Sequence, residues 1–417
     1  TNRMLVTETL PVYVRGGKTR SFTLESMKTS ASSKTLSPYG VTLEMTSNPA
    51  WLAVKALPYL MEYPYACSEQ IFSRYYANTL ASSVLDGAPR IKTLFEQWKN
   101  SGALESQLSK NQELKSLLLQ ETPWVLEAKR EEEQRKNIAL LFDLNRMRME
   151  QAKALAQLQE KQAESGGFPW FEGGPEDWYI TQHIIAGLGK LDYLNVAQDP
   201  VRQELVENGL RFMDEKMREA YANLMKRAQE GLEKPEEDHL HSILVHYLYA
   251  RSFQGMEGLS GEVETAFTYY LEQAKKFWNK KGLMEQGMLA IALNRFAEPE
   301  AAEKIIASLR ERALRSEELG MYWKTPRGLF WSEHPVEAQC LIMEAFHEVG
   351  KNAGEVDEMK VWLLKHKQTN HWATTKATAE AVYTLLQTGS GNKWLSEDKP
   401  VQVAFPQIKK KKAVAAR

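Results

Sequence analysis

A cysteine and a glutamine three residues apart are the pair in this sequence whose types and spacing point to covalent chemistry. Cys67 and Gln70 lie in the run Glu62-Tyr63-Pro64-Tyr65-Ala66-Cys67-Ser68-Glu69-Gln70. Positions i and i+3 share one side of a helical turn, so the sulfur and the side-chain carbonyl can meet. A thiolate that displaces ammonia from the carboxamide would form an internal thioester, which is a stored, activated acyl group. By spacing alone, an ordinary helix start remains the alternative.

The neighbouring residues predict that Cys67 lies at the start of a helix. Pro64 is expected to end any preceding helix, and the pattern of Ile71, Tyr75 and Leu80 predicts a new one. In the first turn, unpaired N–H groups and the helix macrodipole would favour the Cys67 thiolate by about 0.3–1 kcal/mol.

Carboxylates in a glycine-rich loop offer a second kind of chemistry. Glu172, Glu176 and Asp177 lie beside Trp170, Phe171 and Trp178. Carboxylates among aromatic residues are typical of a glycosidase built on an α/α toroid. A carbohydrate-active enzyme is therefore an alternative function.

Three other motifs predict no chemistry. His239, His241 and His246 lack the spacing of a zinc site, so neither a metal ion nor a cofactor is expected. Arg15-Gly16-Gly17-Lys18-Thr19 lacks the first glycine of a phosphate-binding loop and predicts a hairpin turn. Cys340, in a predicted helix, is expected to be a small buried hydrophobic residue.

Both ends of the chain carry short β-rich runs. The strand candidates are 5–7, 12–14, 21–24 and 41–45 within residues 1–46, and 401–405 within residues 391–417. Because these segments flank a large helical block, we expect the two ends to pair in one small, partial β-sandwich. The lysines at 409–412 predict a solvated tail.

Residues 47–390 have the period of helices and predict a mostly α fold. Three units place an aromatic loop before a helix: 167–170 before 179–188, 328–331 before 336–346, and 371–374 before 377–386. Segments 237–250 and 283–296 add apolar helices, and 124–163 predicts a long amphipathic helix on the outside. The predicted architecture is a closed α/α toroid, with an irregular helical array or solenoid as the alternative.

The composition excludes several classes of protein. Of 417 residues, 43% are hydrophobic and 26% charged, which is typical of a soluble globular protein. The net charge of -1 predicts no nucleic-acid partner. Apolar runs are far shorter than the ~18 residues of a transmembrane helix, so we expect no direct membrane insertion of this segment. The sequence begins Thr1-Asn2-Arg3 without a signal peptide, and we expect it to be a piece of a longer protein.

The residues around Cys67 resemble a known motif. Tyr63-Pro64-Tyr65-Ala66-Cys67-Ser68-Glu69-Gln70 is similar to the thioester motif of the α2-macroglobulin and complement family, which typically reads Gly-Cys-Gly-Glu-Gln. Segments 46–51, 57–60, 76–78, 124–163, 328–346 and 372–389 resemble the bacterial α2-macroglobulins, so the resemblance covers nearly the whole chain. Ala66 and Ser68 depart from the motif where many members have glycine, which reaches backbone angles closed to other residues.

The resemblance implies both a fold and a chemistry. The family's thioester domain is an α/α toroid inserted between two parts of a CUB-type β-sandwich. Cys67 would carry the thiol, Gln70 would carry the acyl group, and Glu69 matches the acidic position of the motif. The chain would belong to a bacterial protease inhibitor of the periplasm or cell envelope, which traps proteases covalently and is not an enzyme. Its partners would be proteases and the rest of its own larger chain. A binding scaffold with an inactive thioester site is a further alternative.

Two sets of side chains would support the trap. Tyr63, Tyr65, Phe72 and Tyr76 are predicted to shield the thioester from water. In complement-like members a downstream histidine directs transfer to hydroxyl groups. The downstream candidates here are His239 and His241, and also His183, for which we expect a packing role. We predict that amines are preferred over hydroxyls.

Overall fold

The computed structural model describes residues 14, 17–30, 32–35, 50–63, 67–87, 144–325, 334–367, 371–389, 400–405 and 410–415. The chain divides into two compact units. The larger, called the helix unit below, comprises Pro49–Leu94 and Leu140–Ser396, and the smaller comprises Thr1–Asn48, Phe95–Ala139 and Glu397–Arg417. The protein is mostly helical, which confirms the predicted fold class.

The helix unit is built from buried helices and outer helices. The buried helices are α2 (Ala50–Met61), α3 (Ser68–Gly87), α8 (Trp178–Tyr193), α10 (Ser242–Arg251), α12 (Leu283–Arg295), α14 (Pro335–Ala345) and α16 (Thr375–Gln387). The outer helices are α7 (Leu144–Lys161), α9 (Pro200–Gln229), α11 (Gly261–Phe277), α13 (Pro299–Glu311) and α15 (Ala353–Lys365). Short elements between them are the hairpins β1 (Phe168–Pro169) with β2 (Glu176–Asp177) and β3 (Leu314–Ser316) with β4 (Gly320–Tyr322), the 3-10 turn Trp278–Lys280 and the π-helical turn Phe346–Gly350.

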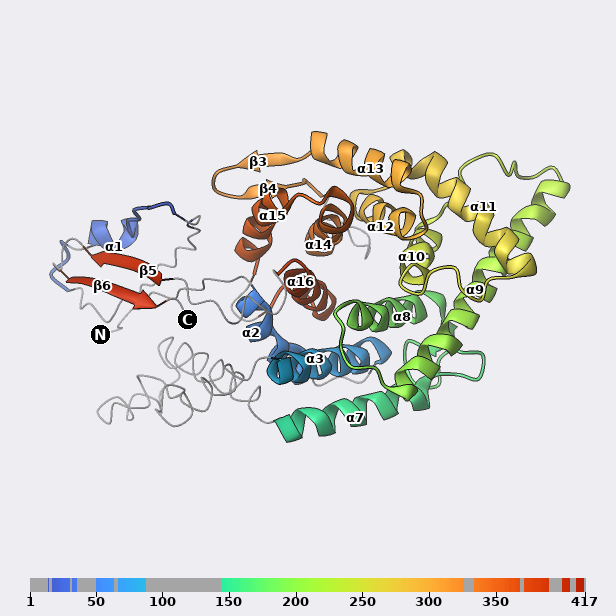
Figure 1. Ribbon diagram of the computed structural model, residues 1–417, viewed down its shortest axis with the longest axis horizontal. Coiled ribbons are helices and arrows are strands. Elements are labelled where there is room, and N and C mark those ends of the chain that lie inside the picture. The colour runs from blue at the N-terminus through green and yellow to red at the C-terminus, as the bar shows by residue number, and fades with distance from the viewer. Residues whose placement is uncertain are drawn as a thin grey trace. The chain divides into compact units, whose positions relative to one another are not determined.

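The buried helices form a ring of contacts. Following the chain, α2 packs on α3, α3 on α8, α8 on α10, α10 on α12, α12 on α14 and α14 on α16, and α16 packs back on α2 and α3. The outer helices surround this ring, as Figure 1 shows, with α7 against α3, α9 against α8 and α13 against α12. This order of contacts is the one expected of an α/α toroid.

The burial of each helix follows its sequence pattern. In α14, every residue from Val336 to Ala345 is buried, because this helix has neighbours on all sides. In α13, only Ala302, Ile305, Ile306 and Leu309 are buried, which is the single apolar stripe of an outer helix. The predicted helices at 179–188, 283–296, 336–346 and 377–386 correspond to α8, α12, α14 and α16.

Side-chain caps and one glycine position the helices that meet at the site. Asp177 begins α8 by accepting a hydrogen bond from the Ile180 N–H at 2.8 Å, and Thr374 begins α16 by accepting one from Ala377 at 3.0 Å. A Cβ atom on Gly187 would lie 2.1 Å from the Phe72 ring, so only glycine allows α3 to pack this closely on α8.

The smaller unit corrects two predictions. Residues 21–24 are not a strand, because the Leu24 carbonyl accepts the Lys28 N–H at 2.9 Å and so starts helix α1 (Glu25–Ser30). The lysines at 409–412 are not a solvated tail, because β6 (Lys410–Ala415) pairs antiparallel with β5 (Pro400–Phe405). Charge does not exclude a strand, since lysines are common on sheet edges. The strand predicted at 401–405 lies within β5.

Several predicted features lie outside the described residues. These are the strands at 5–7 and 41–45, most of that at 12–14, the loop at 328–331, residues 124–143 of the long helix, and Tyr65. The partial β-sandwich, and the pairing of the two ends of the chain within it, stay predictions. In the part that the structure describes, no helix is both long enough and apolar enough to cross a membrane.

Candidate functional site

Cys67 occupies the cap position at the start of α3. Its carbonyl accepts hydrogen bonds from the Gln70 and Ile71 N–H groups at 3.1 and 3.0 Å. Gln70 is then the third residue of the helix. The side chains at these two positions reach toward each other in a capping box, where each serves the other's backbone N–H. The structure therefore places Cys67 and Gln70 three residues apart on the first turn of one helix, as the spacing predicted.

The Cys67 thiol is buried, with 8% of the residue exposed. Burial raises the pKa of this thiol, although the backbone N–H groups of Gln70 and Glu69 act in the opposite direction. The expectation of a favoured thiolate was therefore wrong in its net direction, because the loss of water outweighs the helix N-terminus.

The Gln70 side chain leaves one polar atom without a partner. Its carbonyl oxygen is buried and accepts no hydrogen bond within the described part of the chain. Such an atom costs about 1–3 kcal/mol when it is buried unpaired. Buried polar atoms of this kind call for a functional explanation.

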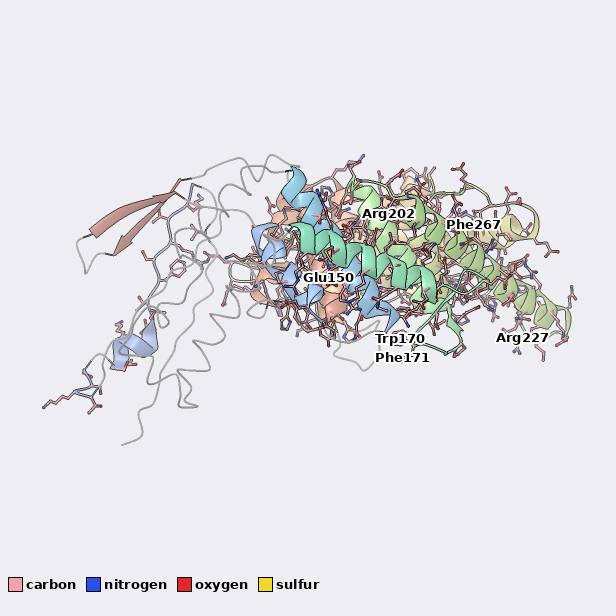
Figure 2. The ribbon with its side chains drawn as sticks, turned by 90° about the horizontal axis from the view of Figure 1, so that it is seen from below. Glu150, Trp170, Phe171, Arg202, Arg227 and Phe267 are labelled. Carbon is pink, nitrogen blue, oxygen red and sulfur yellow. The ribbon has the colours of Figure 1, made fainter. Side chains whose placement is uncertain are left out.

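Ser68 ties the start of α3 to the loop before α8. Its N–H donates to the Trp170 carbonyl at 3.1 Å, and its hydroxyl donates to the Pro169 carbonyl at 2.5 Å. Ser68 is fully buried, so these bonds are shielded from water. Trp170 and Phe171 continue this loop on the surface, as Figure 2 shows. The serine that replaces a glycine of the resembling motif thus holds a loop beside Cys67.

Glu69 connects the first turn of α3 to the first turn of α16. Its carboxylate accepts a hydrogen bond from the Ser73 hydroxyl at 2.9 Å and from the Thr375 hydroxyl at 3.1 and 3.3 Å. Burial raises the pKa of Glu69, while Ser73, Thr375 and the charge of Lys376 partly offset the rise. The acidic position of the motif therefore has a positioning role that joins segments 306 residues apart in the chain.

A half-buried cation, Lys376, lies in the first turn of α16. The Lys376 ammonium donates to the Tyr179 hydroxyl at 2.9 Å. Burial acts to lower the pKa of Lys376, but Tyr179, Glu337 and Glu380 raise it more, so the group stays charged. Burial, with the charges of Lys376 and Lys190, lowers the pKa of His183 to about 3.

The packing role expected of His183 agrees with its surroundings. Its ring lies 5.7 Å from that of Phe72 and 6.3 Å from that of Tyr179, between α3 and α8. Tyr179 in turn stacks on Trp170 at 6.0 Å. This aromatic column of Trp170, Tyr179, His183 and Phe72 links the loop beside Cys67 to α8 and α3.

The aromatic residues predicted as shields occupy different places. Phe72 and Tyr76 are both 2% exposed and pack together at 5.6 Å, and Phe72 faces Gly187 on α8. Tyr63 is half-buried and packs against Tyr59 at 5.7 Å. Their shielding role stays a prediction.

The two histidines that were candidates for directing acyl transfer to hydroxyl groups lie just before α10. The His239 ring bonds the Lys234 carbonyl at 2.8 Å, and the backbone N–H of His239 donates to the Gln273 side-chain oxygen on α11 at 3.0 Å. His241 is exposed and begins α10. Their described partners belong to the α9–α11 region, and none belongs to the turn that holds Cys67. Their role also stays a prediction.

The remaining candidates have structural surroundings. Cys340 is fully buried in α14, and burial raises the pKa of its thiol well above the usual range. Asp177 caps α8. The Glu172 side chain is 94% exposed and pairs with Lys161 at 3.7 Å, and Glu176 is exposed on β2. In this arrangement Asp177 already serves a helix, and no described contact joins the three carboxylates.

Sequence reasoning missed the partners that surround Cys67. Trp170, Tyr179, Thr375 and Lys376 belong to the two repeat units that begin at 167–170 and 371–374. The repeat in the sequence was the signal that could have found these partners, because each repeat unit places an aromatic loop before a buried helix. The beginnings of α3, α8 and α16 meet at one end of the ring, where Ser68 contacts the first loop and Glu69 the second.

Comparison with solved structures finds similarity to bacterial alpha-2-macroglobulins. A crystal structure of the native Escherichia coli protein from domain MG7 to the C-terminus has a TM-score of 0.47 and 13% identity, over 89% of this chain and 46% of that chain. A cryo-EM reconstruction of the native E. coli protein has a TM-score of 0.47 and 11% identity, over 89% and 18%. Salmonella alpha-2-macroglobulin reacted with methylamine has a TM-score of 0.47 and 13% identity, over 89% and 19%.

The chain spans less than half the length of each of these structures. No protein-family model matches it, and no curated protein matches it.

Proposed function

We propose that Cys67 and Gln70 form an internal thioester, and that the chain is the thioester-bearing part of a bacterial α2-macroglobulin-like protease inhibitor. One observation carries the proposal. Cys67 caps the helix in which Gln70 is the third residue, and the Gln70 carbonyl oxygen is buried without a partner in the described part of the chain.

Formation of the thioester needs only these two side chains. The Cys67 sulfur attacks the Gln70 side-chain carbon, so that a carbon–sulfur bond forms and the carbon–nitrogen bond breaks. The thiol proton leaves with the nitrogen as ammonia. The backbone N–H groups of Glu69 and Gln70 act to lower the pKa of Cys67 and would stabilise the negative charge of the sulfur during the attack.

The surroundings favour storage of the acyl group. Cys67 and Ser68 are buried, which limits access of water. A thiol with a raised pKa is a poorer leaving group, so burial of the Cys67 sulfur also slows hydrolysis. Among the described residues no donor polarises the Gln70 carbonyl, and the bond therefore lacks the electrostatic help that speeds attack.

Release of the stored group captures a nucleophile. An amine nitrogen attacks the acyl carbon, the carbon–sulfur bond breaks, and the amine proton passes to the Cys67 thiolate. In the whole protein, proposed to act in the periplasm or cell envelope, the amine would be a lysine of an attacking protease. The reaction is used once, so the protein is an inhibitor and not an enzyme. We expect little inhibition from these 417 residues alone.

Paired labelling tests the proposal. Fresh protein is treated with labelled methylamine, and free thiol is titrated before and after. One label at Gln70 should appear for each thiol released at Cys67. Cys67→Ala should take up no label, and Cys340→Ala should behave like the wild type. A Cys67 thiol that titrates fully in native protein before any amine is added would overturn the proposal.

A further inference from the structure

A cavity lies along α3 beyond Gln70, and it is lined by residues of α3 other than those of the aromatic column. It has a volume of 230 Å³ and is enclosed by the end of α2, by α3 and by the beginning of α7. Arg74 and Asn78 line it from α3, one and two turns beyond Gln70. Among the described residues, the Asn78 carbonyl oxygen in its wall accepts no hydrogen bond and Arg74 makes no ion pair, and these two groups define what the cavity can hold.

The first unpartnered group is the Asn78 carbonyl oxygen. Asn78 is 1% exposed. Its amide nitrogen donates to the Arg74 carbonyl at 2.8 Å, which fixes the orientation of the amide. The oxygen then accepts no hydrogen bond from any described residue. A buried acceptor in a cavity wall calls for a donor, because leaving it unpaired is costly.

The second unpartnered group is the Arg74 guanidinium. It is half-buried in the same wall and makes no ion pair in the part of the chain that the structure describes. The other arginine of the cavity, Arg146, lies 3.7 Å from Glu62. Arg74 is therefore the cation available to an incoming anion. A guanidinium binds a carboxylate through two parallel hydrogen bonds.

The other residues of the cavity wall limit the size and the charge of the occupant. Met61 and Met147 supply apolar, adaptable surface. Glu150 lies on α7, labelled in Figure 2, and is exposed at the cavity. It repels a second negative charge. The volume is below the about 300–1,000 Å³ of drug-sized ligand sites, so the occupant is small.

A larger hollow elsewhere shows why these groups matter. The hollow on α11 has a volume of 310 Å³, but its polar side chains already have partners. Gln273 bonds the His239 N–H and the Pro235 carbonyl, Lys275 pairs with Glu272 and Glu298, and Lys276 donates to the Glu236 carbonyl. The hollow on α11 is larger, but its polar groups are already paired, so it offers a ligand no unpaired group to bind.

We propose that the cavity between α2, α3 and α7 binds the free C-terminus of a peptide. The terminal carboxylate pairs with Arg74, and the amide N–H of the last residue donates to the Asn78 oxygen. An uncharged terminal side chain packs against Met61 and Met147. Proteolysis adds new ends of this kind at positions that were internal to the intact chain.

A titration with a short peptide tests the proposal. The probe is acetyl-Ala-Ala-Met with a free carboxylate, and the same peptide with an amidated C-terminus is its control. Calorimetry should show binding of the acid at least tenfold tighter than the amide. Acetate alone should bind at least tenfold more weakly than the peptide acid, because it lacks the N–H and the side chain.

Variants of the full chain locate the binding. Arg74→Gln should weaken binding of the acid at least tenfold, and Asn78→Leu at least threefold. Arg148→Gln, an exposed cation of α7 outside the cavity, should leave affinity unchanged. Cys67→Ala should also bind normally, so failure of the thioester proposal would not affect this test. Equal binding of acid and amide, equal binding of acetate and peptide, or equal effects of Arg74→Gln and Arg148→Gln would overturn the proposal.

Discussion

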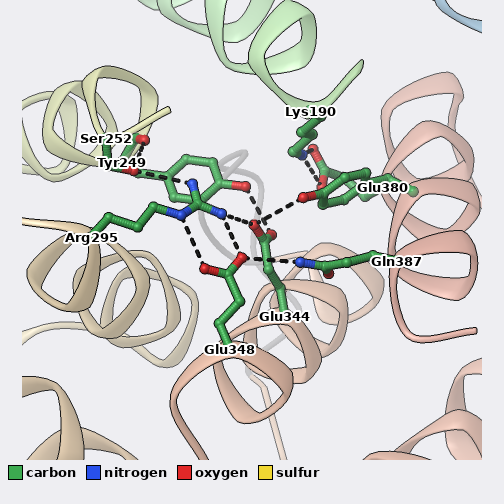
Figure 3. A network of polar contacts seen from close by, with 9 residues as sticks. Lys190, Tyr249, Ser252, Arg295, Glu344, Glu348, Glu380 and Gln387 are labelled. Atoms are coloured by element: carbon green, nitrogen blue, oxygen red, sulfur yellow. Dashed lines mark hydrogen bonds and ion pairs between the residues drawn. The ribbon is translucent and has the colours of Figure 1, made fainter. Parts of the chain in front are cut away.

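Two regions of the helix unit differ in how their buried polar groups are paired. In the network of Figure 3, the Arg295 guanidinium donates to Glu348 at 2.5 and 3.0 Å and to Glu344 at 3.1 Å. Tyr249 adds a bond to Glu344 at 2.8 Å, and Lys190 pairs with Glu380 at 2.6 Å. Every charge drawn there has an opposite charge beside it.

The first turn of α3 is different. The side chains of Ser68 and Glu69 both make hydrogen bonds. The side-chain carbonyl oxygen of Gln70, the next residue, is buried and accepts no hydrogen bond in the described part of the chain. The charged groups of the network hold α12, α14 and α16 together, whereas the first turn of α3 leaves the Gln70 carbonyl oxygen unpaired among the described residues. Other buried polar atoms of the described residues, among them the Asn78 oxygen, are also unpaired, so the candidate site is marked by the combination of an unpaired Gln70 carbonyl with a cysteine that caps the same helix.

The largest effect should come from breaking the paired region. Replacing Arg295 with Met leaves Glu344 and Glu348 buried without their cation. Removing one partner of a buried pair costs about 3–5 kcal/mol of unfolding free energy. Denaturant unfolding of Arg295→Met checks this value, with Lys275→Met as the control.

The Lys275 pairs with Glu272 and Glu298 are partly exposed, so the control should lose less than about 1 kcal/mol. Similar losses in the two variants would show that the network is no more important than surface pairs.

The pH dependence of stability should reveal the same network. Burial raises the pKa of Glu344 to about 7 from 4.5, although Arg295 and Lys190 oppose the rise. A raised pKa means that the folded state favours the protonated form. The stability from this group is complete below pH 4.5 and is lost as pH rises to 7, by up to about 3 kcal/mol.

Glu344→Gln should remove this loss, so its unfolding free energy should vary less than that of the wild type between pH 4.5 and 7. Glu272→Gln, a change at an exposed carboxylate, should keep the slope of the wild type. Parallel curves for wild type and Glu344→Gln would contradict the assignment.

A smaller effect should come from loosening the loop beside Cys67. Ser68→Ala removes the hydroxyl bond to Pro169 and should cost about 1 kcal/mol. The expected functional result is faster hydrolysis on storage, measured as the half-life of methylamine-reactive protein. Ser73→Ala, which removes a bond to Glu69 one turn later, is the comparison. A Ser68→Ala half-life equal to that of the wild type would argue against a role of the loop in keeping the site dry.

The smallest effect is expected at the histidines before α10. Offered labelled methylamine and labelled glycerol at equal concentration, fresh protein should take up mainly methylamine. His239→Ala and His241→Ala should not alter the ratio, because the described contacts of these residues lie around α9–α11. Dominant glycerol uptake that is lost in either variant would mean that a histidine does direct the acceptor.

Local features of the site were predictable from sequence, and distant ones were not. Pro64 and the pattern after Cys67 predicted the start of α3, because helix boundaries depend on neighbouring residues. The bonds of Glu69 to Thr375 and of Ser68 to Pro169 join segments 306 and 101 residues apart. Such contacts depend on the order in which the ring helices pack, which no local pattern states.

The errors have equally specific causes. The helix N-terminus suggested a lower pKa for Cys67, but burial of the thiol, which sequence does not report, reverses the direction. Residues 21–24 have the composition of a strand, yet the Leu24 carbonyl begins a helix. The lysines after 408 have the composition of a tail, yet β6 pairs with β5 along its whole length. In the first case the tertiary fold removes water from the thiol, and in the other two a backbone partner overrides the local propensity.

The intact mass of freshly purified protein tests the thioester most directly. If Cys67 and Gln70 are bonded, the mass should be lower than the sequence mass by one ammonia, and methylamine should raise it by one methylamine. Cys67→Ala should have its full sequence mass and should not react. A wild-type mass equal to the sequence mass, unchanged by methylamine, would contradict the account.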